Sequence, residues 1–209
     1  MSKIKSLSKG MTTTEVYHLL KLTENIFKDE ATYGHLIDYL PEIAQLAVMN
    51  AKPQLIRRIK NPSKNVQLES VKQAGWALEF IKKPSKRVIL EAVSNNGKAI
   101  QWIKNPSEEI KLIAVEQDPL AIQFIPNPSP KVQLIAVKKY PLAAQWIENP
   151  TEDVQMVVVR ELDTGMLLIK NPTGKVKKLN DKLRKKEIKD NKNKDSNNEK
   201  GILLVDKDE

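Results

Sequence analysis

Residues 105–126, NPSEEIKLIAVEQDPLAIQFIP, and residues 127–148, NPSPKVQLIAVKKYPLAAQWIE, are two consecutive copies of one 22-residue unit. Each copy of the unit begins with an Asn-Pro-Ser or Asn-Pro-Thr triplet, in which Lys once replaces Asn. A sequence that resembles itself at a fixed period of this kind is typical of a repeat protein. The proline of the triplet recurs with no insertion at Pro62, Pro84, Pro106, Pro128, Pro150 and Pro172.

Two breaks divide each unit into two short helices. The Asn-Pro step disfavours helical geometry, so it ends the preceding helix. The Ser or Thr that follows is a preferred N-cap residue, whose hydroxyl accepts a hydrogen bond from a backbone N–H of the next helix. The second break follows the proline of the triplet at a constant spacing, at Gly75, Gly97, Pro119 and Pro141. Asn96 and Asp118, just before two of these positions, are candidate caps of the second helix. About ten residues remain for the first helix and about seven for the second, too few to be stable without stacking.

The apolar residues of the unit repeat with the same period. The residue two places before each triplet is always isoleucine: Ile59, Ile81, Ile103, Ile125, Ile147 and Ile169. At 3.6 residues per turn, these isoleucines share an arc of about 100° with a column of alanines, and this arc is the expected core face. No segment alternates apolar and polar residues as a strand does. The sequence therefore predicts an all-α fold, a right-handed α-solenoid of about six short two-helix repeats.

The ends of the chain depart from the repeat. A helix from about Thr14 to Phe27 has one apolar face, which suits the N-terminal cap that a solenoid needs. After Thr173 the apolar columns are lost and Lys, Asn and Asp predominate. We therefore expect an N-terminal helical cap over residues 1–40, the solenoid over residues 41–176, and a charged, partly disordered tail over residues 177–209.

The unit, approximately NPSxxVQLxAVxxxPxAIQWI, resembles the short HEAT-like tandem helical repeats of uncharacterised bacterial, phage and large-virus proteins. The resemblance covers residues 54–176. An earlier unit matches only loosely, because Ile37 and Pro53 fall in the right columns without a triplet between them. The resemblance implies an architecture that serves recognition, and it implies no activity. A phage or mobile-element origin is one setting that it suggests.

Two columns of the second helix are candidates for partner binding: Gln101, Gln123, Gln145, Trp102, Phe124 and Trp146. On a helical wheel the glutamines point about 155° away from the centre of the core arc, so they are expected to be exposed. Regularly spaced amides suit an extended peptide or a helix, and an ordinary solvated face has the same pattern. The aromatic column lies about 105° from that centre, where it either packs between repeats or faces a ligand.

The net charge of +9 favours polyanions only where the positive groups share one surface. The segment 174–209 has 12 Lys or Arg and 8 Asp or Glu, a net of +4, which leaves +5 for the segment 1–173. The body of the chain is therefore expected to be mildly basic. The candidate nucleic-acid-binding residues are Lys182, Arg184, Lys185 and Lys186, and the acidic residues among them make a solvated helix the competing interpretation.

Catalysis has little support in this sequence. There is no cysteine, and His18 and His35 are the only histidines, with no metal-ligand spacing around them. No glycine-rich phosphate loop or other catalytic motif occurs, so we expect neither enzyme activity nor a cofactor or metal. The chain has no long apolar run and no secretory signal, which indicates a cytoplasmic protein without a membrane partner.

Two functions are consistent with these features. The first is a non-catalytic protein-binding module that presents an extended repeat surface and, in a phage or mobile-element setting, blocks or regulates a host protein. The second is a basic nucleic-acid-binding protein that uses the solenoid and the lysine-rich tail. A protein partner is the first expectation, and the sequence leaves the oligomeric state open.

Overall fold

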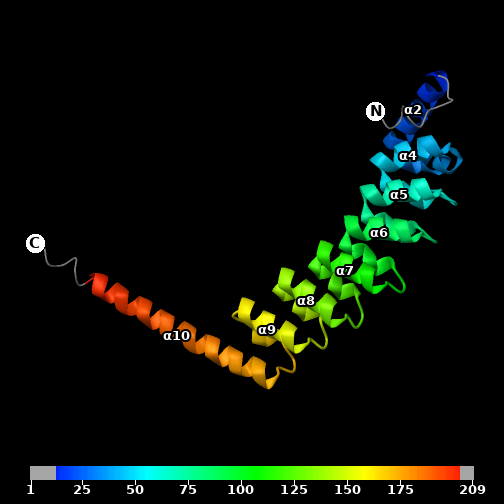
Figure 1. Cartoon of the computed structure of the whole chain (residues 1–209). Coiled ribbons are helices and arrows are strands. Elements are labelled where there is room, and N and C mark those ends of the chain that lie inside the picture. Colours follow the sequence, from blue (N-terminus) through cyan, green and yellow to red (C-terminus); the bar gives the residue numbers. More distant parts are fainter. Residues whose placement is uncertain (1–12, 203–209) are drawn as a thin grey trace, which may run out of the picture. The chain divides into compact units, whose positions relative to one another are not determined.

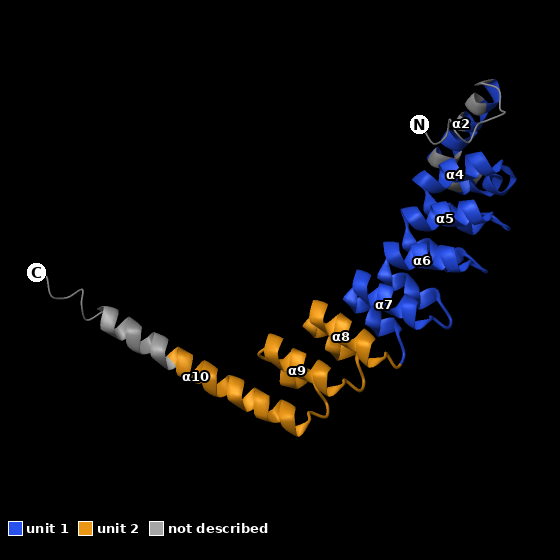
Figure 2. Cartoon of the chain, in the orientation of Figure 1, with its two compact units in different colours: residues 1–126 blue, residues 127–209 orange. Residues whose placement is uncertain are grey.

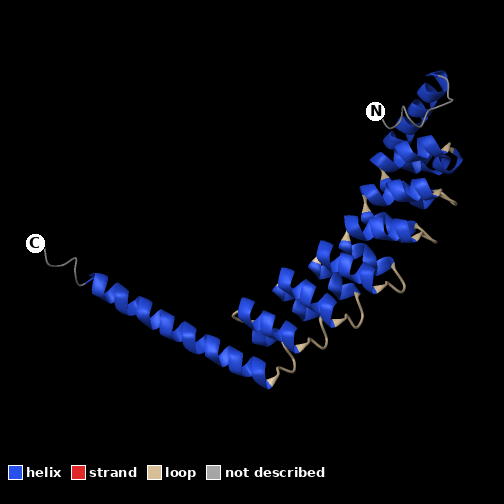
Figure 3. Cartoon of the chain, viewed as in Figure 1, coloured by secondary structure: helices blue, strands red, loops and turns tan. Residues whose placement is uncertain are grey.

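The computed structural model describes residues 13–202, and every regular element within that range is a helix (Figure 3). The predicted all-α repeat fold is thereby confirmed. Residues 1–12 of the predicted cap and residues 203–209 of the predicted tail lie outside the described range. The chain divides into two compact units, unit 1 (residues 1–126) and unit 2 (residues 127–209), which Figure 2 distinguishes by colour. The sequence-based boundaries after residues 40 and 176 stay predictions.

Unit 1 begins with an α-helix close to the one expected from about Thr14 to Phe27 and continues as pairs of one α-helix and one 3₁₀-helix. The α-helices α4, α5, α6 and α7 pack side by side in chain order (Figure 1). Its elements are α2 (Thr13–Lys28), α3 (Glu30–Tyr33), η1 (Gly34–Tyr39), α4 (Glu42–Ala51), η2 (Pro53–Arg58), α5 (Lys64–Gln73), η3 (Gly75–Phe80), α6 (Lys86–Asn95), η4 (Gly97–Trp102), α7 (Glu108–Gln117) and η5 (Pro119–Phe124).

Unit 2 has the same alternation and ends in a long helix. Its elements are α8 (Pro130–Lys139), η6 (Pro141–Trp146), α9 (Glu152–Glu161), η7 (Gly165–Leu168) and α10 (Gly174–Ile202). Helix α9 packs against both α8 and α10. The charged tail begins within one continuous helix from Gly174 to Ile202, and the disorder expected for part of the tail stays a prediction. Lys, Arg and Glu have good helix propensity, which favours extension of the helix beyond its apolar first turns.

The Ser and Thr residues of the triplets are N-caps, as the sequence predicted. Each side-chain hydroxyl accepts a hydrogen bond from the backbone N–H three residues later, at 3.3 to 3.5 Å. The bonded pairs are Ser63 with Val66, Ser85 with Val88, Ser107 with Ile110, Ser129 with Val132, Thr151 with Val154, and Thr173 with Val176. The predicted caps at the second break, Asn96 and Asp118, are also present. Local side-chain chemistry therefore sets where these helices begin.

The second helix of each pair is a 3₁₀-helix, not the α-helix assumed in the helical-wheel argument. A segment of six residues leaves few groups for i→i+4 hydrogen bonds, and i→i+3 bonds satisfy more of them. In η4, for example, the N–H of Ile103 donates to the carbonyl of Ile100 at 3.0 Å. Side chains three residues apart therefore share a face, which changes the predicted directions of the glutamine and aromatic columns.

A buried glutamine joins the triplets of consecutive repeats in unit 2. The Gln155 side chain donates to the carbonyls of Pro150 at 3.0 Å and Asn171 at 3.4 Å, and it accepts from the N–H of Thr173 at 3.1 Å. Gln133 makes the equivalent three bonds one repeat earlier. Both side chains are buried. The glutamine that follows the first valine of α8 and of α9 thus links consecutive inter-repeat loops, a role that was not expected from the sequence.

Candidate functional site

The 3₁₀ geometry sorts the side chains of each second helix into three rows. In η4, Ile100 lies on the same face as Ile103, and Ala99 on the same face as Trp102. Lys98 and Gln101 form the third row, and Gln101 is exposed. The core arc of the helical wheel thus becomes two adjacent rows, and the third row faces solvent. Binding residues on this layer are expected from the third row and from the exposed edge of the aromatic row.

The predicted glutamines lie on the solvent row, but two of them are engaged in their own helices. The Nε2 atom of Gln101 donates to the carbonyl of Lys98 at 3.1 Å, and that of Gln123 donates to the carbonyl of Leu120 at 3.0 Å. Gln101 and Gln123 come from η4 and η5, which contact each other in unit 1. Gln145 is exposed on η6 in unit 2. The amides of Gln101 and Gln123 therefore close local turns, which is a structural role alongside any contact with a partner.

The aromatic column is more buried in unit 1 than in unit 2. Phe80, Trp102 and Phe124 are half-buried, and each lies on the same face of its 3₁₀-helix as a fully buried alanine. Trp146 of η6 is 50% exposed. The packing interpretation thus accounts for much of the unit 1 column, whereas Trp146 presents half of its surface to solvent.

Unit 2 exposes further apolar side chains on η6 and η7. Tyr140 and Leu142, at the start of η6, are exposed, and Leu167 of η7 is 84% exposed. The helices η6 and η7 contact each other. We call this set, Tyr140, Leu142, Trp146 and Leu167, the unit 2 apolar face. Packing within the chain does not explain large apolar side chains at this exposure, so they are candidates for contact with another molecule.

The predicted nucleic-acid-binding residues of the tail lie on α10, where Lys182, Arg184, Lys185 and Lys186 share the helix with acidic residues. A cavity of about 420 Å³ between α9 and α10 is lined by three cations, Arg160, Arg184 and Lys186. It is also lined by three carboxylates, those of Asp163, Glu187 and Asp190. Positive and negative groups alternate here, so this surface lacks the single sign of charge that attracts a polyanion.

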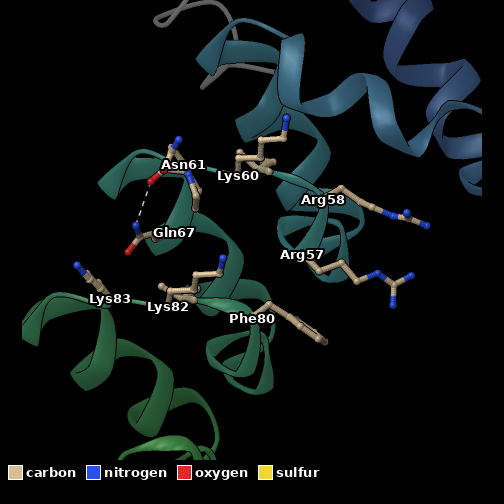
Figure 4. Close-up of a pocket in the computed structure, with 11 residues that line it drawn as sticks. Arg57, Arg58, Lys60, Asn61, Gln67, Phe80, Lys82 and Lys83 are labelled. Carbon is tan, nitrogen blue, oxygen red and sulfur yellow. Dashed lines mark hydrogen bonds between the residues drawn. The ribbon is translucent and has the colours of Figure 1, made fainter.

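A second cavity, of about 470 Å³, lies in unit 1 and has a different charge (Figure 4). Its basic residues come from two consecutive inter-repeat segments, residues 57–62 and 80–83, and none of its lining residues carries a carboxylate. We call it the basic pocket. The cations that line it are Arg57, Arg58, Lys60, Lys82 and Lys83, as Figure 4 shows.

Two buried isoleucines position the basic pocket. Ile59 and Ile81 follow η2 and η3 in extended conformation, and both side chains are buried. Because successive side chains of an extended segment point in opposite directions, the residues that flank each isoleucine are directed away from the core. The N–H groups of Ile59 and Ile81 each donate to the carbonyl three residues earlier, at 3.1 Å, which fixes the two segments.

One carboxylate lies close to the edge of the basic pocket. Asp38 accepts a hydrogen bond from the N–H of Lys60 at 2.8 Å, and its other oxygen is 4.0 Å from the Lys60 Nζ. The Lys60 side chain is 79% exposed, so this pair is weak and leaves the ammonium available to other anions. On the pocket wall, Gln67 donates to the carbonyl of Pro62 at 3.0 Å, the bond drawn in Figure 4.

The basic pocket was not expected from the sequence, because the net charge of the tail was compared with the net charge of all the residues before it. The segment 57–87 has nine Lys or Arg and two Glu, a net of +7, and the rest of the chain carries +2. The body is therefore not uniformly mildly basic, as its average suggested. A sliding count of charge over a window of that length would have found this segment. Only the structure shows that the charges from two repeats line one cavity.

Comparison with known proteins adds no further assignment. No family model matches the chain, and no curated protein or solved structure is significantly similar to it. Within residues 13–202, no group of three or more acidic or histidine side chains is placed to hold a metal ion. No helix in that range is long and apolar enough to cross a membrane.

Proposed function

We propose that this protein is a non-catalytic binding module, a right-handed α-solenoid of about six repeats that recognises a protein partner. The observation that carries the proposal is the unit 2 apolar face, in which Trp146 and Leu167 are 50% and 84% exposed. Exposed aromatic and apolar side chains gathered on adjacent helices are typical of protein interfaces, and Trp and Tyr dominate interface energetics. By covering a partner's working surface, such a module regulates the partner without chemistry of its own.

The geometry of the repeats supports this function. The 3₁₀ layer holds its exposed row rigidly, because each short helix is packed against its neighbours and its turns are closed by backbone hydrogen bonds. A rigid apolar surface loses little conformational entropy on binding, which favours affinity. Gln145 lies on the same helix as Trp146 and supplies an amide at the edge of the apolar face.

An affinity capture from nuclease-treated lysate of the source organism tests the proposal. The bait is the full chain, and its matched variant combines Trp146→Ala with Leu167→Asp. We expect the wild type to enrich a specific protein and the double variant to lose at least about tenfold of that enrichment, as expected for interface anchors. Tyr39→Ala, a change at an exposed aromatic residue of η1, is the control and should capture like the wild type.

Circular dichroism of the variants separates a binding defect from a folding defect. Leu167 is 84% exposed, so its substitution should leave the melting temperature nearly unchanged. If the double variant enriches the same protein as strongly as the wild type, the unit 2 apolar face is not the binding surface. If no protein is enriched by any form, the proposed function is wrong.

A further inference from the structure

The distribution of charge points to a second binding site, in unit 1. The segment 57–87 carries +7 of the chain's net +9. It includes both segments of the basic pocket and the first turns of α5 and α6, where Lys64 and Arg87 are exposed. Another cation of this region, Lys86, is paired with Glu109 at 2.9 Å. The positive charge is therefore concentrated at the inter-repeat loops of unit 1 and the helix ends that adjoin them.

Five of these cations line one cavity of about 470 Å³. Their shared sign of charge makes the electrostatic potential of this surface positive, which attracts anions. Three carboxylates belong to neighbouring positions: Asp38, which is engaged by the Lys60 backbone, Glu42, which accepts hydrogen bonds from the side chains of Ser63 and Asn65, and Glu79, which is exposed on η3. None of the three lines the cavity. The site is therefore complementary to a ligand that carries several negative charges.

An aromatic pair borders the same cavity. Phe80 lines the basic pocket and lies edge-to-face with Trp76, with ring centroids 6.3 Å apart and planes at 88°. Trp76 is 37% exposed, so part of its ring is open to solvent. Proteins that bind single-stranded nucleic acid combine these two features, cations that follow the phosphates and aromatic rings on which bases stack. An acidic peptide would use the cations and gain little from the rings.

We propose that the basic pocket, with Phe80 and Trp76 at its border, binds single-stranded nucleic acid. The phosphates are held by cations from two consecutive repeats, and a base stacks on the exposed aromatic surface. Lysine suits this role because it contacts phosphate as a point charge and imposes no sequence preference. The site uses residues that are separate from the unit 2 apolar face, so it is independent of the proposed protein-binding function.

Fluorescence anisotropy of the full chain with a labelled oligo(dT) and a labelled oligo(U) of equal length tests the proposal. The pocket variant is Lys60→Gln, Lys82→Gln and Lys83→Gln combined. The matched control removes the same charge from the tail, with Lys182→Gln, Lys185→Gln and Lys186→Gln. These lysines lie at the surface, so neither triple variant should alter the helical circular dichroism spectrum. We expect the pocket variant to lose about tenfold or more in affinity at low salt and the tail variant to lose little.

Two further measurements separate nucleic acid from other anions. The affinity of the wild type should fall with salt, with a slope of roughly −0.7 for each phosphate contacted. Trp76→Ala should weaken oligonucleotide binding about tenfold, since stacking is lost, and leave the affinity for a polyglutamate peptide unchanged. If polyglutamate binds as tightly as the oligonucleotides and Trp76→Ala affects neither, the site takes an acidic protein segment. Absence of oligonucleotide binding at low salt, or an equal loss in both triple variants, overturns the proposal.

Discussion

At the scale of single residues, one buried side chain holds two repeats together in unit 2. Gln155 is 5% exposed and bonds to the loops on either side through Pro150, Asn171 and Thr173. Replacement by an apolar residue of similar length removes the hydrogen-bond partner of those part-buried backbone groups, and a loss of this kind costs about 1–3 kcal/mol. We expect Gln155→Met to be destabilised by that amount in urea unfolding. Gln145→Met, at an exposed site of the same unit, should change stability by less than about 0.5 kcal/mol.

Gly97, at the break between α6 and η4, lies where a larger residue would not fit. A Cβ atom added to Gly97 would lie closer than 3.0 Å to the carbonyl oxygen of Ala114, a separation that real Cβ atoms essentially never show. The backbone of η4 approaches α7 this closely only because the side chain is absent. We expect Gly97→Ala to lower stability by about 1–3 kcal/mol, since the two elements must separate. Gly174→Ala is the control, because no atom lies within 4 Å of the added Cβ. Equal melting temperatures for the two variants would contradict the observed packing.

At the scale of elements, an ion pair joins the first turns of α9 and α10. The Lys175 ammonium donates to Glu152 at 2.8 Å, and this bond, with a second from Thr173, lowers the pKa of the Glu152 carboxyl. The same bond raises the pKa of Lys175. A lowered carboxyl pKa gives stability that is present above its unfolded value, near 4.5, and is lost as the pH falls further. A raised lysine pKa gives stability that is present below its unfolded value, near 10.5, and is lost as the pH rises further.

The expected result is a small, pH-dependent difference in melting temperature between the wild type and Glu152→Gln. The difference should be constant from about pH 6 to pH 9 and should shrink as the pH falls below 4.5 or rises above 10.5. Both groups are exposed, so salt should reduce it. Glu161→Gln on the same helix is the control. A difference that persists at about pH 2 would show that the glutamine acts through something other than the ion pair.

The same scale shows what sequence can and cannot predict in this fold. The positions of the breaks and caps follow from local chemistry, so Ser107 and Asn96 were assigned correctly from the sequence. The helix type of the second element does not follow from local chemistry. The α-helix and the 3₁₀-helix share residue preferences, and they differ in which hydrogen bonds a short segment closes. The α-helical assumption placed Trp102 at the edge of the core arc. In the 3₁₀-helix, Trp102 shares a face with the alanine of η4 and is half-buried. The directions of the candidate binding residues in the structure thus differ from those that the helical wheel gave.

At the scale of the whole chain, packing is local. Within the described residues, extensive contacts join elements of the same or adjacent repeats. The stability of such a protein is approximately a sum of repeat and nearest-neighbour terms, so a local defect need not unfold the whole chain. The two units should therefore respond differently to a defect placed in one of them.

A buried charge in η4 tests this expectation. Ile100 is 1% exposed, and η4 contacts α6, α7, η3 and η5, all in unit 1. Ile100→Asp buries an unpaired carboxylate at the centre of that group, a defect expected to cost more than about 4 kcal/mol. We expect amide hydrogen exchange to lose protection in α6, α7 and the adjacent 3₁₀-helices while α9 keeps most of its protection. Gln101→Asp, one residue away and exposed, should leave both units protected. Uniform loss of protection through α9 would mean that the chain unfolds as one cooperative body, in which case stability is not a sum over neighbouring repeats.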